Sequence, residues 1–83
     1  MHLSIHSLKK TLFDGEAHSL NCKTEAGEIT VLDHHRPLIS VLTQGVLKII
    51  DKESKTHYIS ISFGFLEVQK DNARAIIGET IAG

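Results

Sequence analysis

The histidines are the residues of this chain best able to bind a metal or exchange a proton, because imidazole ligates zinc and titrates near neutral pH. His2 and His6 are four residues apart, a spacing that suits zinc on a helix. The residues around them alternate in polarity like a strand, and four residues of strand separate two Cα atoms by about 13 Å. We therefore expect these two side chains to lie too far apart to share one metal ion.

His34 and His35 are adjacent, and His18 and His57 stand apart from the other histidines. Neighbouring residues of a strand point to opposite faces, so the adjacent pair chelates poorly if extended, although a loop could offer one or two ligands. We expect scattered surface or interface histidines, with no metal and no cofactor. The alternative function is a free-standing β-sandwich module that binds a small ligand or metal through its histidines.

Cys22 is the only cysteine, which excludes an intrachain disulfide and leaves one candidate nucleophile. A catalytic cysteine needs a base and an orienting group, and the alternating position of Cys22 instead predicts a small core residue. The glutamates that could pair as acid and base lie beside predicted turns or on polar faces: Glu16, Glu25, Glu28 and Glu67. No phosphate loop, nucleophile elbow or zinc signature is present, so we expect no catalytic residues and no enzyme.

A chain of 83 residues has room for one domain, which spans 1–83. Its hydrophobic content of 41% is that of a globular protein rather than a disordered or collagen-like one. Ten acidic against nine basic residues argue against a nucleic-acid partner. No stretch is apolar enough to span a membrane, and the N-terminus does not read as a signal peptide, so any membrane association must run through a partner.

Alternation of apolar and polar residues runs through most of the chain, for example in Leu3-Ser4-Ile5 and in residues 59–63. Turn signals recur about every ten residues, and Asp14-Gly15 is predicted to form a tight turn. Ile76-Ile77 predicts a strand buried on both faces, or a bulge. Together these patterns predict an all-β sandwich or barrel of eight or nine short strands.

Two single residues refine this prediction. Pro37 lacks a backbone donor, so it should open a strand rather than lie inside one. Gly64 predicts a bulge or a close backbone approach. The polar connection within residues 27–38 is either a binding segment at the end of the sandwich or an ordinary solvated loop.

Five ordered groups of residues, read together, resemble one known family. They are Leu12-Phe13-Asp14-Gly15-Glu16, Gly27-Glu28 followed by Val31-Leu32, His35 with Pro37-Leu38-Ile39, Gly45-Val46-Leu47-Lys48-Ile49, and Gly64-Phe65-Leu66-Glu67-Val68. In order and without gaps, they are similar to the N-terminal β-sandwich domain of the epsilon subunit of F-type ATP synthases. The resemblance implies an all-β, ten-stranded sandwich of two five-stranded sheets.

The resemblance also implies a place in a rotary machine. Such a subunit binds the gamma subunit on one side and the polar loops of the c-ring on the other. The catalytic alpha/beta hexamer is an indirect partner. It couples ion translocation to ATP synthesis or hydrolysis without catalysing a reaction itself. The implied location is peripheral, on the cytoplasmic face of a bacterial or archaeal plasma membrane, with no direct insertion.

Site residues follow from the motifs that match. Glu28 matches the family's acidic residue that faces the c-ring loops, and Ile29 and Thr30 share that region. His35 matches a histidine near gamma, and Ser40 and Thr43 follow on the same segment. A structural module in some other complex is a further possibility.

Several departures from the family pattern carry expectations of their own. His34 stands where the family has a glycine that permits a positive φ, so the loop should take another path. Phe63 replaces a glycine beside Gly64, and Cys22-Lys23-Thr24 replaces a leucine-proline-glycine bend. The chain ends near Glu79, where the family's helical hairpin would begin. We therefore expect no helical inhibitory element, in either a naturally short or a shortened protein.

Overall fold

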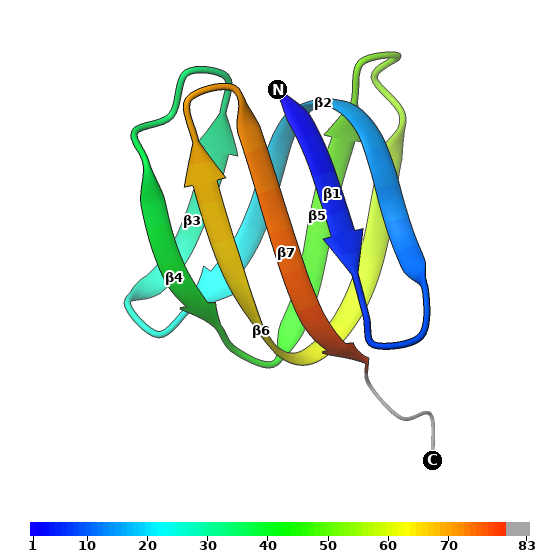
Figure 1. The fold of residues 1–83 in the computed structure, drawn as a ribbon, viewed down its shortest axis with the longest axis vertical. Helices are drawn as coiled ribbons and strands as arrows, with labels where there is room; N and C mark the ends of the chain where they lie inside the picture. The colour runs from blue at the N-terminus through cyan, green and yellow to red at the C-terminus, as the bar shows by residue number, and fades with distance from the viewer. Residues whose placement is uncertain (80–83) are drawn as a thin grey trace.

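Strands form wherever the sequence alternates in polarity, and the computed structural model describes them over residues 1–79 (Figure 1). The strands are β1 (His2–His6), β2 (Thr11–Thr24), β3 (Gly27–Leu32), β4 (Leu38–Leu42), β5 (Gly45–Asp51), β6 (Thr56–Gln69) and β7 (Asn72–Glu79). Within this range there is no helix that could cross a membrane. The stretch from Thr80 to Gly83, next to the expected helix start, lies outside the described residues.

The strands form two layers, and the long strands β2 and β6 belong to both. The front sheet contains the first half of β2, then β1, β7, the second half of β6, and β4. The back sheet contains β3, the second half of β2, β5, and the first half of β6. Figure 1 shows the front sheet towards the viewer, with β3 and β5 behind it. The register shifts near Ala17 in β2 and between Ile61 and Phe63 in β6, where each strand passes from one layer to the other.

Counted by layer, with each half of β2 and β6 taken separately, the front sheet has five strands and the back sheet four. The predicted all-β sandwich is confirmed. The described residues account for nine of the ten strands that the resemblance implies. The count of short strands expected from alternation agrees with this, because β2 and β6 each serve as two.

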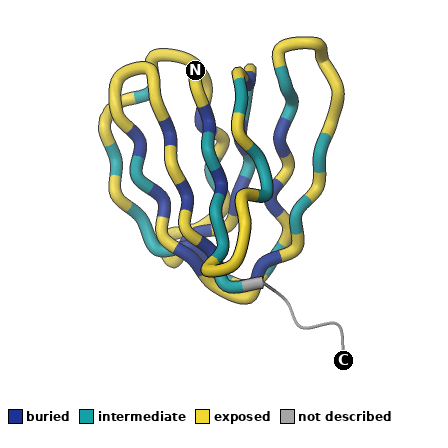
Figure 2. Tube along the Cα trace, turned by 45° about the vertical axis from the view of Figure 1, so that its right-hand side comes forward, coloured by how far each residue is buried: buried dark blue, intermediate teal, exposed yellow. Residues whose placement is uncertain are grey.

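Every strand sends apolar side chains into one core between the two layers. The fully or almost fully buried members are Leu3, Ile5, Ala17, Leu20, Cys22, Val31, Leu42, Leu47, Ile49, Ile61, Leu66, Val68, Ala73, Ala75 and Ile77. Figure 2 shows buried and exposed positions alternating along the strands, as the period of two requires. The core thus fixes which residues each sheet presents outside.

The tight turn predicted at Asp14-Gly15 is wrong. Both residues lie inside β2, where Asp14 pairs with Ser4 and Gly15 with Leu3 of β1. A local turn signal is weak compared with a full ladder of hydrogen bonds to a neighbouring strand, so the strand continues through it.

The bend at Cys22-Lys23-Thr24 is also replaced by straight strand, and the chain turns one residue later. The Thr24 hydroxyl accepts from the Ala26 amide at 3.1 Å and donates to the Gly27 carbonyl at 2.8 Å. Gly27 has φ of 120°, a value that side chains disfavour. Thr24 therefore stabilises this turn from the buried end of β2.

Gly64 lies where β6 and β7 approach closely, as predicted. A Cβ atom at this position would lie 2.9 Å from the Ile76 carbonyl oxygen and 3.0 Å from Ile77 Cγ2. Phe63 places its ring against the backbone of Gly78, where an added Cβ would come within 2.2 Å of the ring. The large side chain thus fits beside Gly64 by covering a second glycine. Pro37 directly precedes β4.

Candidate protein interface

The loop between β3 and β4 keeps a left-handed residue where the family has glycine. His34 has φ of 64°, so the expected change of path is not needed at this residue. Its Nδ1 lies 3.3 Å from an Asp71 carboxylate oxygen in the turn between β6 and β7. The His35 amide donates to the Leu32 carbonyl at 3.1 Å and closes the turn. The loop is therefore anchored to a neighbouring turn at this end of the sandwich.

Asp33 provides a second anchor for the same loop. Its carboxylate accepts from the N-terminal ammonium of Met1, which also donates to the Ala17 carbonyl at 3.1 Å. The hydrogen bond from this ammonium holds the pKa of Asp33 below its usual value. The carboxylate is thus ionised at neutral pH and can hold the loop against β1 and β2.

The three residues matched to the gamma contact do not form one patch. His35 is half-buried in the loop between β3 and β4, a loop at the upper end of Figure 1, and its ring Nδ1–H donates to the Arg36 carbonyl at 2.7 Å. Ser40 lies on β4, half-buried, on the inward-facing side of the strand that Leu38 and Leu42 share. Thr43 follows β4 at the opposite end, where its amide donates to the Lys23 carbonyl at 3.0 Å. These residues are spread along the length of β4.

Exposed apolar side chains gather instead on the outer face of the front sheet. Ile39, Phe65 and Ile76 are 79%, 56% and 51% exposed and come from β4, β6 and β7. Phe65 pairs directly with Ile76, and the three line one shallow groove of about 190 Å³. We call these three residues the apolar stripe. Apolar side chains that gather on one face in this way mark protein-interaction sites.

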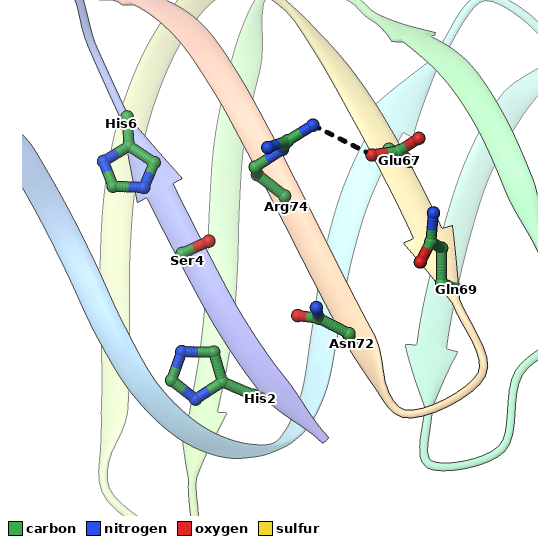
Figure 3. A pocket seen from close by; sticks show the side chains of 7 residues that line it. All are labelled: His2, Ser4, His6, Glu67, Gln69, Asn72 and Arg74. Carbon is green, nitrogen blue, oxygen red and sulfur yellow. Dashed lines mark hydrogen bonds and ion pairs between the residues drawn. The ribbon is translucent and has the colours of Figure 1, made fainter.

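The rest of that face is polar, and much of its charge is already paired. A depression of about 430 Å³ adjoins the stripe and shares Glu67 and Arg74 with its groove, and Figure 3 shows the side chains that line it. Its lining residues are His2, Ser4, His6, Glu67, Gln69, Asn72 and Arg74. Arg74 donates to Glu67 at 3.1 Å, and His2 lies 2.7 Å from Asp14. Because Arg74 and Glu67 neutralise one another and His2 contacts Asp14, we take the apolar stripe rather than these polar groups as the candidate contact on the described part of this face.

Glu28 and Thr30 lie on the outer face of the back sheet, whereas Ile29 packs against the core. The Asn21 side-chain amide donates to Glu28 Oε2 at 3.1 Å and to Thr30 Oγ1 at 2.9 Å. These groups belong to an open depression of about 300 Å³ that we call the acidic depression. It is lined by Ser19, Asn21, Glu28, Thr30, Lys48 and Ile50. Two of the three residues matched to the c-ring contact are therefore brought together on one surface.

The histidine side chains contact different partners and do not converge on one site. His57 Nε2 lies 2.8 Å from Asp51 Oδ2, His18 contacts the Lys52 carbonyl at 3.1 Å, and His6 contacts the Thr11 hydroxyl at 3.1 Å. Over residues 1–79 no group of three histidine, cysteine or acidic side chains is arranged to hold a metal ion. The metal-binding alternative thus lacks a convergent ligand set in the described part of the chain.

Cys22 is fully buried, as its alternating position predicted. Burial, with a smaller contribution from the charge of Glu28, raises the pKa of its thiol to about 11. The thiol is therefore protonated at neutral pH, and a protonated thiol is a poor nucleophile. Cys22 is a core residue.

Sequence reasoning missed the apolar stripe, although a signal was present. The two adjacent apolar residues Ile76-Ile77 predict a strand buried on both faces, or a bulge. The structure buries Ile77 and leaves Ile76 exposed. An apolar residue at an outward position can therefore indicate a surface that a partner covers.

The chain matches known proteins along almost its full length. Residues 1–82 match the family described as ATP synthase, Delta/Epsilon chain, beta-sandwich domain. The chain is 36% identical over 74 residues to the ATP synthase epsilon chain of Protochlamydia amoebophila, covering 89% of this chain and 50% of the relative. It is 32% identical over 81 residues to that of Bordetella parapertussis, covering 98% and 58%. The chain thus spans half, or slightly more than half, of these relatives.

Solved structures share the fold. A chain in the cryo-EM structure of the Euglena gracilis mitochondrial ATP synthase (OSCP/F1/c-ring) superposes with a TM-score of 0.86 at 23% identity, covering 93% of this chain and 49% of that one. A chain of the central stalk/c-ring structure from Tetrahymena thermophila gives 0.80 at 17% identity, covering 95% and 63%. With the family match over residues 1–82, this protein belongs to the delta/epsilon chain family of ATP synthases and forms the family's β-sandwich domain.

Proposed function

We propose that this chain is a central-stalk subunit of a rotary ATP synthase that binds gamma and the c-ring and couples ion translocation to ATP synthesis or hydrolysis. It does so without catalysing a reaction, since its contact with the alpha/beta hexamer is indirect, through gamma. Family membership over residues 1–82 supports the assignment to the complex. The surface that carries the proposal is the apolar stripe.

Gamma is the partner proposed for the front sheet. The stripe presents Ile39, Phe65 and Ile76 on three neighbouring strands, where burying the exposed part of each side chain is worth about 1–2 kcal/mol. A subunit that rotates with gamma needs a lasting contact, and apolar burial provides one that salt does not screen. His35 before β4 and Thr43 after it then lie at the border of this contact, and Ser40 supports it from the inward-facing side of β4.

The c-ring loops are the partner proposed for the outer face of β3, which carries Glu28. Glu28 and Thr30 present polar atoms on the outer face of β3, and Ile29 packs inwards between them. An exposed carboxylate of this kind pairs with basic side chains, and such a contact depends on salt. Through these two partners the chain is held at the cytoplasmic face of a bacterial or archaeal plasma membrane.

Calorimetric titration of the purified chain with purified gamma subunit tests the proposal. We expect association with a dissociation constant of about 1 µM or tighter, as a lasting contact requires. The Phe65→Glu variant should lose this association, and Tyr58→Glu, at an exposed aromatic residue of the back sheet, should keep it. No detectable heat with the unaltered chain at micromolar concentrations would refute the gamma contact.

A further inference from the structure

The Glu28 carboxylate has a neutral partner where the register offers a cationic one. Lys23 stands directly opposite Glu28 in the β2–β3 pair, and Asn21 stands opposite Thr30. Nevertheless the hydrogen bond to Glu28 comes from the Asn21 amide, at 3.1 Å, and no ion pair of Glu28 is found among the described residues. The carboxylate therefore accepts a hydrogen bond from a neutral amide, and no ion pair within the described residues balances its charge.

The Lys23 side chain can lie away from Glu28 because Gly45, on the neighbouring strand β5, leaves space for it. The Lys23 stem lies over Gly45 at the start of β5, with its Cδ 3.3 Å from where a Cβ of residue 45 would be. This position takes the lysine towards β5 and away from β3. A larger residue at 45 would crowd the stem.

Asn21 also separates Glu28 from a second lysine. Lys48 of β5 stands opposite Asn21 in the register and lines the other side of the acidic depression. Both amide hydrogens of Asn21 are directed to β3, one to Glu28 and one to Thr30. Asn21 thus lies between the carboxylate and the Lys48 side of the depression.

We propose that Asn21 is a positioning residue, which orients Glu28 and keeps it from the chain's own lysines so that it can receive a cationic side chain of a partner loop. This inference rests on the proposed c-ring contact. One carboxylate oxygen accepts from Asn21, and the other is left to accept from an arginine or lysine of the partner. With one oxygen bonded to Asn21, the remaining oxygen suits a single charge-assisted hydrogen bond from a lysine ammonium or from one arm of an arginine guanidinium.

The first part of the test needs no partner. NMR coupling constants of the free chain report the χ1 rotamers of Glu28, which should occupy one dominant rotamer in the unaltered chain. Asn21→Ala should average the rotamers, whereas Ser19→Ala, in the same depression but without a bond to Glu28, should not. A single Glu28 rotamer that persists in Asn21→Ala would overturn the inference, with thermal unfolding confirming that each variant is folded.

The second part measures binding to a detergent-solubilised gamma–c-ring subcomplex by surface plasmon resonance. Asn21→Ala should weaken binding about 3–10-fold, and Glu28→Gln should weaken it at least as much. The double variant should be no weaker than Glu28→Gln alone, because the two residues act as a unit. Lys48→Met in the Asn21→Ala background should restore part of the affinity, since it removes a competing cation.

The two ideas fail in different ways. If the unaltered chain does not bind the subcomplex, the proposed function fails. If it binds and Glu28→Gln weakens binding while Asn21→Ala leaves it unchanged, the c-ring contact stands and the role of Asn21 is overturned. Additive losses in the double variant would also overturn that role, because they would make Asn21 an independent contact.

Discussion

The front and back sheets of this sandwich bury the same kind of residue inside but present different chemistry outside. The front sheet exposes the apolar stripe beside charges that are paired with one another, as Arg74 is with Glu67. The back sheet exposes the acidic depression, in which Glu28 is held by a neutral amide and keeps its charge. One scaffold can therefore carry a lasting apolar contact and a salt-dependent polar contact at once.

Because one surface is apolar and the other polar, substitutions that add or remove a charge should affect binding at the two surfaces differently. An apolar contact fails when a charge enters it, because the charge must be desolvated without a partner. A polar contact of exposed groups loses less when one group is neutralised. We therefore expect a larger loss of affinity from a charge placed in the apolar stripe than from neutralising Glu28.

The largest effect is expected for Phe65→Glu in the apolar stripe. The substitution places a charge at the centre of the proposed gamma contact, so we expect gamma affinity to fall roughly 100-fold or more. Thermal stability should change little, because the side chain is 56% exposed. Calorimetry with gamma and a thermal melt measure both. An unchanged gamma affinity would place the contact elsewhere.

Gly64→Ala should act on the fold under the same stripe. The added methyl group meets the Ile76 carbonyl oxygen at 2.9 Å, so β6 and β7 must move apart. We expect a loss of about 1–3 kcal/mol in the free energy of unfolding, measured by urea titration. The Gly15→Ala variant is the matched control, since its nearest atom outside the neighbouring residues is 4.0 Å away. Equal losses in both variants would contradict the close approach at Gly64.

Glu28→Gln should weaken binding to the gamma–c-ring subcomplex by roughly 10-fold at low salt, because it removes the negative charge of the acidic depression and leaves the positive charge of Lys48. The difference from the unaltered chain should shrink as salt rises. Affinity for isolated gamma should not change. A loss that is independent of salt would indicate that Glu28 contributes by shape rather than by charge.

The smallest effect is expected for Asp51→Asn in the hairpin between β5 and β6. The hydrogen bond from His57, helped by the amides of Lys55 and Glu53, holds the pKa of Asp51 below its usual value. A lowered folded pKa means that its stabilisation is present above the unfolded value of about 3.9 and is lost as the pH falls through the folded pKa. The melting temperatures of the variant and the unaltered chain should therefore converge as the pH falls through the lowered folded pKa of Asp51. A constant difference at all pH values would exclude this linkage.

The side chains that face the core could be predicted from the sequence. Alternation in segments such as Leu3-Ser4-Ile5 fixes which side chains face the core, because a strand offers only two faces. The burial of Cys22 followed from the same period. The turn predicted at Asp14-Gly15 does not form, because these residues pair with Ser4 and Leu3 of β1 and this pairing outweighs a two-residue turn signal. The pairing depends on residues outside the local dipeptide, so the dipeptide alone could not predict it.

The surfaces on the outer faces of the two sheets could be predicted only in part. Glu28 and Thr30 share a surface because they are two residues apart on one strand, which the sequence contains. The apolar stripe joins β4, β6 and β7, and their adjacency is a matter of topology. Likewise Asn21 reaches Glu28 only through the register of β2 and β3. Alternation does not specify which strands are neighbours.

Photo-cross-linking in the assembled complex would test the two-surface assignment most directly. A benzophenone amino acid placed at Phe65 in one variant and at Thr30 in another reports which subunit lies against each sheet. We predict that the Phe65 position cross-links to gamma and the Thr30 position to the c-subunit. Cross-linking of both positions to the same subunit, or of Phe65 to the c-subunit, would contradict the assignment of the front sheet to gamma and the back sheet to the ring.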